Sequence, residues 1–206
     1  MKRSDNDIEC KILTESNIIK ENAAVYGTRP YDEYTLKDYY ALPEDQRAEL
    51  IDGTFYNMAS PGVTHQGISM NMSIQIGNYI SKRGGSCRVF AGPIDVQLDC
   101  DDKTMLVPDI IVVCDQDKLK NDRIMGAPDF VAEIVSPSSR KRDYVIKTAK
   151  YSEAGVREYW IVDPEKERVL VYNFAGDSVP VMYGMNEKIP VEIFGGDLSL
   201  SFPDGI

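Results

Sequence analysis

The sequence predicts an α/β domain in which a mixed β-sheet is flanked by α-helices. Isoleucine and methionine residues recur every four positions within residues 64–83, which is the spacing of one face of a helix. Short runs rich in valine and isoleucine lie before and after a second helical segment, and such runs are typical of buried strands. The order helix, strands, helix, strands favours a single sheet with helices packed against it.

The first half of the chain is expected to contain two helices, a hairpin and two strand segments. Thr35 can cap a short helix that stops near Pro43. The pair Asp52-Gly53 favours a type I′ hairpin turn, and Gly84 is expected to end the long helix. The predicted elements are a helix over 34–40, a hairpin over 48–58, a helix over 64–83, a strand or bent strand pair over 87–98 and a strand over 105–114.

In the second half, Ser136 and Ser138 precede a helix that ends at Gly155. We expect these serines to cap free amide groups of the helix rather than to act as nucleophiles, because no histidine base lies close in the pattern. Tyr159 and Trp160 are expected to pack in the core. The predicted elements are strands over 129–135, 158–163 and 168–172, a helix over 140–154 and short edge structure in the tail.

We expect residues 1–30 to form a partly flexible N-terminal arm and residues 31–206 to form a single domain. No stretch approaches the roughly 18 apolar residues that a membrane-spanning helix needs, and residues 1–22 lack the apolar core of a signal peptide. The four cysteines lie far apart, without a Cys-x-x-Cys pair. Reduced thiols and a cytoplasmic location are therefore the simplest interpretation.

The charge balance argues against tight, non-specific binding of nucleic acid. The formal net charge is −10 at pH 7, whereas proteins that hold nucleic acid by its phosphates usually present a basic face. Local basic patches remain possible at residues 82–83 and 140–142. The chain has one histidine, so a metal site would have to use mainly oxygen ligands, which favours magnesium, manganese or calcium over zinc.

Asp109 and Glu133 each stand in a run of β-branched residues that otherwise has the composition of a buried strand. An ionised carboxylate that leaves water costs several kcal/mol unless a cation or a set of donors meets it. Two such carboxylates can together hold one divalent metal. We therefore predict that Asp109 and Glu133 are metal ligands.

Lys147 is the candidate third member of this site. Asp143, Lys147 and Tyr151 follow one another at intervals of four residues, so an α-helix would place them on one face. If this helix packs over the strand that it leaves, the ammonium of Lys147 can steady a phosphate or orient an attacking water. The alternative is a solvated surface pair of Asp143 and Lys147, worth a few tenths of a kcal/mol.

Several phrases of the sequence together resemble the PD-(D/E)XK nuclease superfamily, and more closely one bacterial branch of restriction-endonuclease-like domains whose cellular role is mostly unassigned. The resemblance covers residues 32–200, and its most specific part is the segment over 133–164. The phrases are Glu49-Leu50-Ile51-Asp52-Gly53, Ser60-Pro61 with His65, Ala91-Gly92-Pro93-Ile94-Asp95-Val96, Val107-Pro108-Asp109, Val131-Ala132-Glu133-Ile134-Val135-Ser136-Pro137-Ser138, Lys147 with Tyr151, and the stretch from Ala154 to Pro164.

The resemblance implies a restriction-endonuclease-like core and hydrolysis of DNA phosphodiesters with Mg²⁺, for which Mn²⁺ can substitute. Asp109 and Glu133 would be the metal ligands, joined by a backbone carbonyl just after Glu133. One position departs from the pattern of the superfamily, whose lysine stands two residues after the glutamate, where this chain has Val135. The related branch has its lysine on the following helix, which makes Lys147 the substitute.

Three further residues are candidates for supporting roles. Glu49 can reach the metal from the hairpin, or it can be a solvated residue at a strand edge. His65, at the start of the long helix, can contact phosphate or a neighbouring side chain, or it can be a helix-terminal hydrogen-bonding group. Asp95 can be an acid beside the metal, but an aspartate near a Gly-Pro bend is also ordinary turn chemistry.

Two classes of function follow. The first is a Mg²⁺-dependent endonuclease that acts on DNA through Asp109, Glu133 and Lys147. The second is a catalytically silent protein with the same fold that acts as a binding or assembly module, which the acidic charge and Val135 favour. Nucleases of this kind often form homodimers, and we expect a homo-oligomer.

Overall fold

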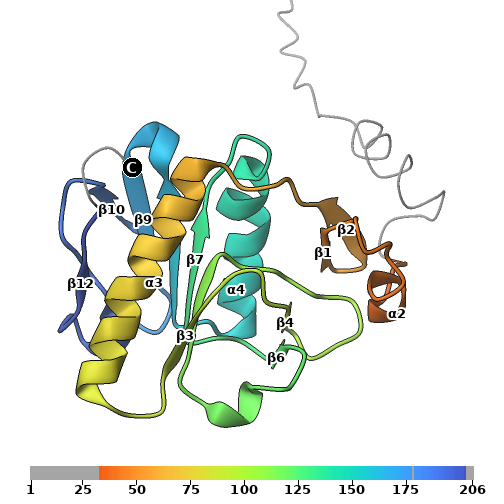
Figure 1. Cartoon of the computed structure of the whole chain (residues 1–206), viewed down its shortest axis with the longest axis horizontal. Helices are drawn as coiled ribbons and strands as arrows, with labels where there is room; N and C mark the ends of the chain where they lie inside the picture. The colour runs from red at the N-terminus through yellow and green to blue at the C-terminus, as the bar shows by residue number, and fades with distance from the viewer. Residues whose placement is uncertain (1–32, 178, 203–206) are drawn as a thin grey trace, which may run out of the picture.

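The computed structural model describes residues 33–177 and 179–202, so the arm predicted over residues 1–30 lies outside it. Its centre is a six-stranded mixed sheet in the order β10-β9-β8-β7-β5-β3, with helices on both faces (Figure 1). The predicted fold class is therefore confirmed. The strands of this sheet are β3 (Arg88–Ala91), β5 (Ile110–Val113), β7 (Phe130–Ile134), β8 (Glu158–Asp163), β9 (Arg168–Asn173) and β10 (Val181–Gly184).

The two long helical segments cover opposite faces of the sheet. The helix α3 (Val63–Arg83) packs its buried Ile68, Met72 and Ile76 on the face that holds Ile110 and Val112 of β5. The alternate residues of β5 point to the other face, as the pleat of a strand requires, and pack with Tyr151. That face is covered by a continuous helical segment made of η2 (Arg142–Lys147) and α4 (Thr148–Ala154), which also connects the parallel strands β7 and β8.

A separate hairpin of β1 (Ala48–Ile51) and β2 (Thr54–Asn57) packs beside the sheet, next to the short helix α2 (Leu36–Tyr39). Asp52 and Gly53 have positive φ angles of 48° and 73°, as the predicted type I′ turn requires. Leu50 and Met105 exchange two backbone hydrogen bonds of 2.9 and 2.7 Å, which tie the hairpin to the segment that leads into β5. The remaining elements are β4 (Val96–Gln97), η1 (Gln116–Lys118), β6 (Ile124–Met125), η3 (Pro164–Lys166), β11 (Ile189–Pro190), η4 (Glu192–Phe194) and β12 (Ser199–Leu200).

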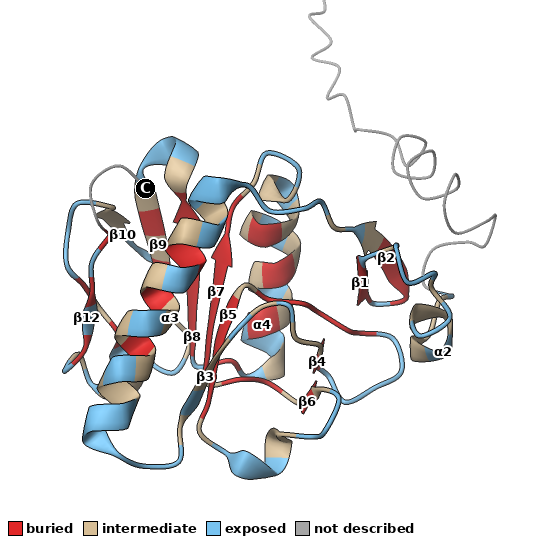
Figure 2. Ribbon diagram, viewed as in Figure 1, coloured by how far each residue is buried: buried red, intermediate tan, exposed pale blue. Residues whose placement is uncertain are grey.

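Burial in the structure follows these layers (Figure 2). All four residues of β5, all five of β7 and all six of β8 are buried, so the centre of the sheet has no solvent-exposed residue. Tyr159 and Trp160 are fully buried, as predicted.

Three expectations about local structure are wrong. Asp109 lies just before β5 rather than inside a strand, because the ladder with β3 ends at the pair of Ala91 and Ile110, beyond which β3 gives way to Gly92 and Pro93. The predicted α-helix over 140–154 has π-helical geometry between Arg142 and Lys147. Cys87 and Cys114 are joined by a disulfide rather than reduced, because the pairing of β3 with β5 places them opposite each other.

Candidate active site

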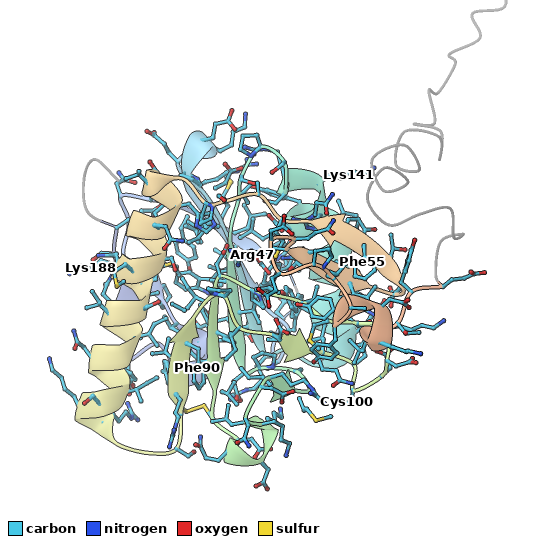
Figure 3. All side chains as sticks on the ribbon, turned by 45° about the vertical axis from the view of Figure 1, so that its right-hand side comes forward. Arg47, Phe55, Phe90, Cys100, Lys141 and Lys188 are labelled. Atoms are coloured by element: carbon cyan, nitrogen blue, oxygen red, sulfur yellow. A yellow bond between two sulfur atoms is a disulfide. The ribbon has the colours of Figure 1, made fainter. Side chains whose placement is uncertain are left out.

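A pocket of about 310 Å³ lies where the end of β7, the residues before β5, the start of α3 and the hairpin come together. Its lining contains most of the acidic and basic residues that the sequence pointed to. Arg47, labelled in Figure 3, also lines it and directly precedes the hairpin strand β1. The charged and titratable residues of the lining are Arg47, Glu49, His65, Asp109, Glu133, Arg142, Asp143 and Lys147.

Asp109 is held in place through one of its two carboxylate oxygens. The backbone N–H of Ile134 donates to Asp109 Oδ2 at 2.7 Å, and His65 Nε2 lies 3.1 Å from the same atom. Burial lowers the pKa of His65, but the hydrogen bond and the charge of Asp109 outweigh it, so the pKa is raised overall. This favours the protonated ring, which donates to Asp109.

Glu133, on the buried strand β7, is also held through one oxygen. Lys147 Nζ donates to Glu133 Oε1 at 2.8 Å and the hydroxyl of Tyr151 donates to it at 2.6 Å. All three side chains are almost fully buried. These contacts hold the carboxylate in one orientation.

Glu49 joins the same cluster from the hairpin and is fully buried rather than solvated. Its Oε1 lies 2.8 Å from Lys147 Nζ and accepts a hydrogen bond of 3.0 Å from the backbone N–H of Val107. Its Oε2 lies 3.2 Å from Nε of Arg142. Lys147 therefore lies between a carboxylate of the hairpin and a carboxylate of the central sheet.

The π-helical segment η2 brings two residues of this cluster into the pocket lining. Asp143 and Lys147 are only 1% and 2% exposed, so the alternative of a solvated surface pair is wrong. Lys147 Nζ lies 3.7 Å from Asp143 Oδ1. A π-helix has a wider turn than an α-helix, and single π-turns within helices are frequent at functional sites.

Three carboxyl groups thus share one buried ammonium. Burial raises the pKa of Glu133 well above its ordinary value and also raises that of Asp143. Burial lowers the pKa of Lys147, but the charges of Glu133, Glu49 and Asp143 outweigh it and keep the lysine protonated. Lys147 and Arg142 together supply two positive charges against these three carboxyl groups, which leaves the cluster able to gain from a further cation.

The donor set fits a divalent cation that prefers oxygen. Among the described residues, Asp109 Oδ1 and Glu133 Oε2 accept no hydrogen bond, while the other oxygen of each carboxylate is occupied. No group of three or more His, Cys, Asp or Glu side chains in the described ranges is arranged to hold a metal. Mg²⁺ does not require such a group, because it is commonly bound by one or two carboxylates, with waters and substrate phosphates as the other ligands.

The structure brings together five of the six candidate residues and leaves one outside. Asp109, Glu133, Lys147, Glu49 and His65 all line the pocket. Asp95 does not line it, and its carboxylate instead accepts a hydrogen bond of 3.0 Å from the hydroxyl of Tyr39. The side chain of Asp95 thus contacts α2 rather than the pocket or its own Gly-Pro bend.

The sequence predicts no site role for Tyr151 or Arg47, and it indicates Arg142 only as part of a possible basic patch over 140–142. The signals for Tyr151 are its shared helix face with Lys147 and its place beside Lys147 in the resemblance. Arg47 gave no signal, and the contact of Arg142 with Glu49 could not be predicted, since both depend on how the hairpin docks. Val135, which stands where the superfamily has its lysine, is buried among apolar side chains.

The family described as "Uma2: Putative restriction endonuclease" matches residues 36–202. The chain belongs to the Uma2 family. This match confirms the resemblance drawn from the sequence phrases. The Uma2 chain is 25% identical to the "Uncharacterized protein slr1290" of Synechocystis sp., over 81% of this chain and 88% of that protein.

A solved structure shares the fold of this Uma2 chain. It is from Anabaena variabilis, is described as "a putative nuclease belonging to DUF820", and matches with a TM-score of 0.67. The match covers 81% of this chain and 94% of that one at 23% identity. No helix among the described residues of the Uma2 chain is long and apolar enough to span a membrane.

Proposed function

We propose that this protein is a Mg²⁺-dependent endonuclease that hydrolyses DNA phosphodiester bonds, with Asp109 and Glu133 as the metal ligands. The observation that carries the proposal is the pair of carboxylates that line one pocket, each fixed through one oxygen and each with its second oxygen without a partner among the described residues. Membership of a family described as restriction endonucleases supports the same chemistry.

A bound Mg²⁺ would stabilise negative charge on the phosphate and lower the pKa of a coordinated water. The residues of the chain orient the ligands. His65 and the N–H of Ile134 fix Asp109, and Lys147 and Tyr151 fix Glu133. Preorganised ligands of this kind cost no reorganisation when charge develops in the reaction.

In this proposal Lys147 does not contact the phosphate, as a lysine without an ion-pair partner could, but acts on the carboxylates beside it. Its ammonium pairs with Glu49 and Glu133 at 2.8 Å each, so it stabilises the ionised form of Glu133 that a metal needs. Contact with the phosphate is better assigned to Arg47, which lines the pocket and has no ion-pair partner among the described residues. A guanidinium can bind a phosphate through two parallel hydrogen bonds.

The test is calorimetric titration of the protein with Mn²⁺, together with cleavage of supercoiled plasmid DNA in Mg²⁺. The variants Asp109→Asn and Glu133→Gln should lose both the binding heat and the cleavage. Each variant replaces one oxygen of a negatively charged carboxylate by an NH₂ group and so removes the charge. Asp95→Asn is the matched control, since it changes a half-buried carboxylate outside the pocket, and it should keep both signals.

Two results would contradict the proposal. If the wild-type protein gives no binding heat at millimolar Mn²⁺, the metal site is wrong. If metal binds through both carboxylates but plasmid DNA is not cut, the catalytically silent alternative holds.

A further inference from the structure

The outer face of α3 carries an exposed apolar stripe. Val63, Met70 and Ile74 are 93%, 58% and 53% exposed, and their helical spacing places them on one side of the helix together with Gly67. Figure 2 shows this helix at the outside of the sheet, with exposed segments along its length. Exposed apolar side chains that share one face, rather than being scattered singly, often mark an interaction site.

The same helix carries no Asp, Glu, Lys or Arg before Lys82 and Arg83 in its last turn. No Asp, Glu, Lys or Arg occurs from Val63 to Ser81, although charged residues make up 27% of the chain. Depletion of charged residues is the compositional signal of the core of a protein–protein interface. A nucleic acid is not the partner that this face fits, because such a partner needs cations.

The net charge of −10 explains why an uncharged face would suit a second copy of this chain. Two copies repel each other wherever their acidic surfaces meet, and least where neither copy presents a charge. The face of α3 from Val63 to Ser81 is such a region.

The spacing of the stripe is symmetric. Positions 63, 67, 70 and 74 are separated by intervals of four, three and four, so an antiparallel pair of these helices sets Val63 opposite Ile74 and Gly67 opposite Met70. A two-fold interface requires this kind of self-complementarity, whereas an unrelated partner does not. Met70 of each copy can then fill the space that Gly67 of the other leaves.

We propose that α3 is a self-association face, at which two copies of this protein pair about a two-fold axis that passes between residues 68 and 69. The inference does not depend on the proposed nuclease activity. One helix pair buries less area than the roughly 1,600 Å² of a typical stable complex, so the dimer should be weak and should dissociate on dilution. Apolar contacts hold the dimer together against the repulsion between its two acidic copies. Because salt screens this repulsion, higher salt should strengthen the dimer.

Sedimentation equilibrium of the full chain from 5 to 200 µM, at low and high NaCl, tests the proposal. The wild-type protein should dimerise with a dissociation constant of tens of micromolar, which decreases at higher salt. Met70→Glu and Ile74→Glu should raise this constant at least tenfold, while an unchanged melting temperature shows that they fold. The matched control is Met182→Glu, which alters a side chain that is 65% exposed on the edge strand β10 and should leave dimerisation intact.

Cysteine crosslinking tests the register independently, in a background with Cys10 and Cys100 replaced by serine. An oxidised mixture of Val63→Cys and Ile74→Cys chains should form disulfide-linked heterodimers. Neither variant should crosslink alone, because about 11 residues of helix, roughly 16 Å, separate equivalent positions along the pair. The proposal is overturned if the wild type stays monomeric at 200 µM, if Met182→Glu rather than Ile74→Glu abolishes the dimer, or if the mixture fails to crosslink.

Discussion

The hydroxyl of Tyr151 and the ammonium of Lys147 meet on one oxygen of Glu133. Each contact has a different consequence for that carboxylate. Lys147 supplies the positive charge that offsets the loss of hydration, whereas Tyr151 adds direction without charge. Because Tyr151 is fully buried among apolar side chains, its hydroxyl has no water to replace this bond. The two roles can be separated experimentally.

Tyr151→Phe should lower the free energy of unfolding by about 1–3 kcal/mol, the range for a buried hydrogen bond to a charged group. It should also weaken Mn²⁺ binding, because Glu133 then keeps one of its two orienting donors. Chemical denaturation and calorimetry measure the two effects. Tyr159→Phe is the control, since the hydroxyl of Tyr159 donates to the backbone carbonyl of Asp143 rather than to a candidate ligand. Equal loss of metal affinity in both variants would refute a role for Tyr151 in orienting Glu133.

At the scale of elements, the π-helical geometry of η2 decides which side chains reach the pocket. The i, i+4 spacing of Asp143 and Lys147 predicted one shared face, and both residues are indeed turned inward. Val145, between them, is 60% exposed. A π-turn corresponds to one residue added to an α-helix, so its removal should restore α-helical geometry.

Deletion of Val145 should therefore make Lys147 the third residue after Asp143 in an α-helix, so the two side chains stay on one face but their relative angle about the helix axis changes. Because Lys147 pairs with Glu49 and Glu133 at 2.8 Å each, we expect this shift to break at least one of these buried ion pairs, with a loss of about 3 kcal/mol or more in stability and loss of Mn²⁺ binding. Val145→Ala keeps the length of the segment and should change stability by less than about 1 kcal/mol. Thermal melts and calorimetry compare the two variants. A stable deletion variant with full metal affinity would show that the π-turn is not needed.

Among the elements of this fold, some features follow from the local sequence and others depend on contacts between distant segments. The periodicity of α3, the Asp52-Gly53 turn and the valine-rich strands are properties of neighbouring residues, and the structure confirms them. The burial of Glu49 is a property of hairpin docking, which no local pattern contains. The pairing of Cys87 with Cys114 likewise depends on the register of β3 against β5.

For the candidate site, Asp109 and Glu133 could be singled out because a carboxylate is costly among β-branched residues, and Lys147 from its helix spacing and the resemblance; the structure places all three at one pocket. The contacts of each residue within the cluster could not be predicted from the sequence. The distances show that Lys147 is held by two carboxylates, a constraint that comes from the meeting of three separate elements.

The whole molecule is acidic, so under the proposed function a protein of net charge −10 has to approach a polyanion. Long-range electrostatics therefore disfavours binding, and a divalent cation at the pocket would reverse the sign locally. This differs from nucleases whose affinity for DNA rests on an extended basic surface.

DNA binding by this protein should consequently depend on divalent cations. Fluorescence anisotropy with a labelled duplex should show binding in Ca²⁺, which commonly occupies oxygen sites, and at least tenfold weaker binding in EDTA. Asp109→Asn should make the two conditions equal. Equal affinity in Ca²⁺ and EDTA for the wild type would mean that the DNA is held elsewhere on the surface.

The position of Glu49 has a consequence for the evolution of such chains. Its carboxylate meets Lys147, Arg142 and the N–H of Val107, so the contacts that assemble the candidate site also fasten the hairpin to the rest of the fold. A descendant under no selection for catalysis would still need these contacts between the hairpin and the sheet in order to fold. Selection for stability alone would then preserve Glu49 and Lys147, whereas Asp109 would be freer to drift. Among relatives, an aspartate at position 109 is thus a better marker of retained chemistry than a lysine at position 147.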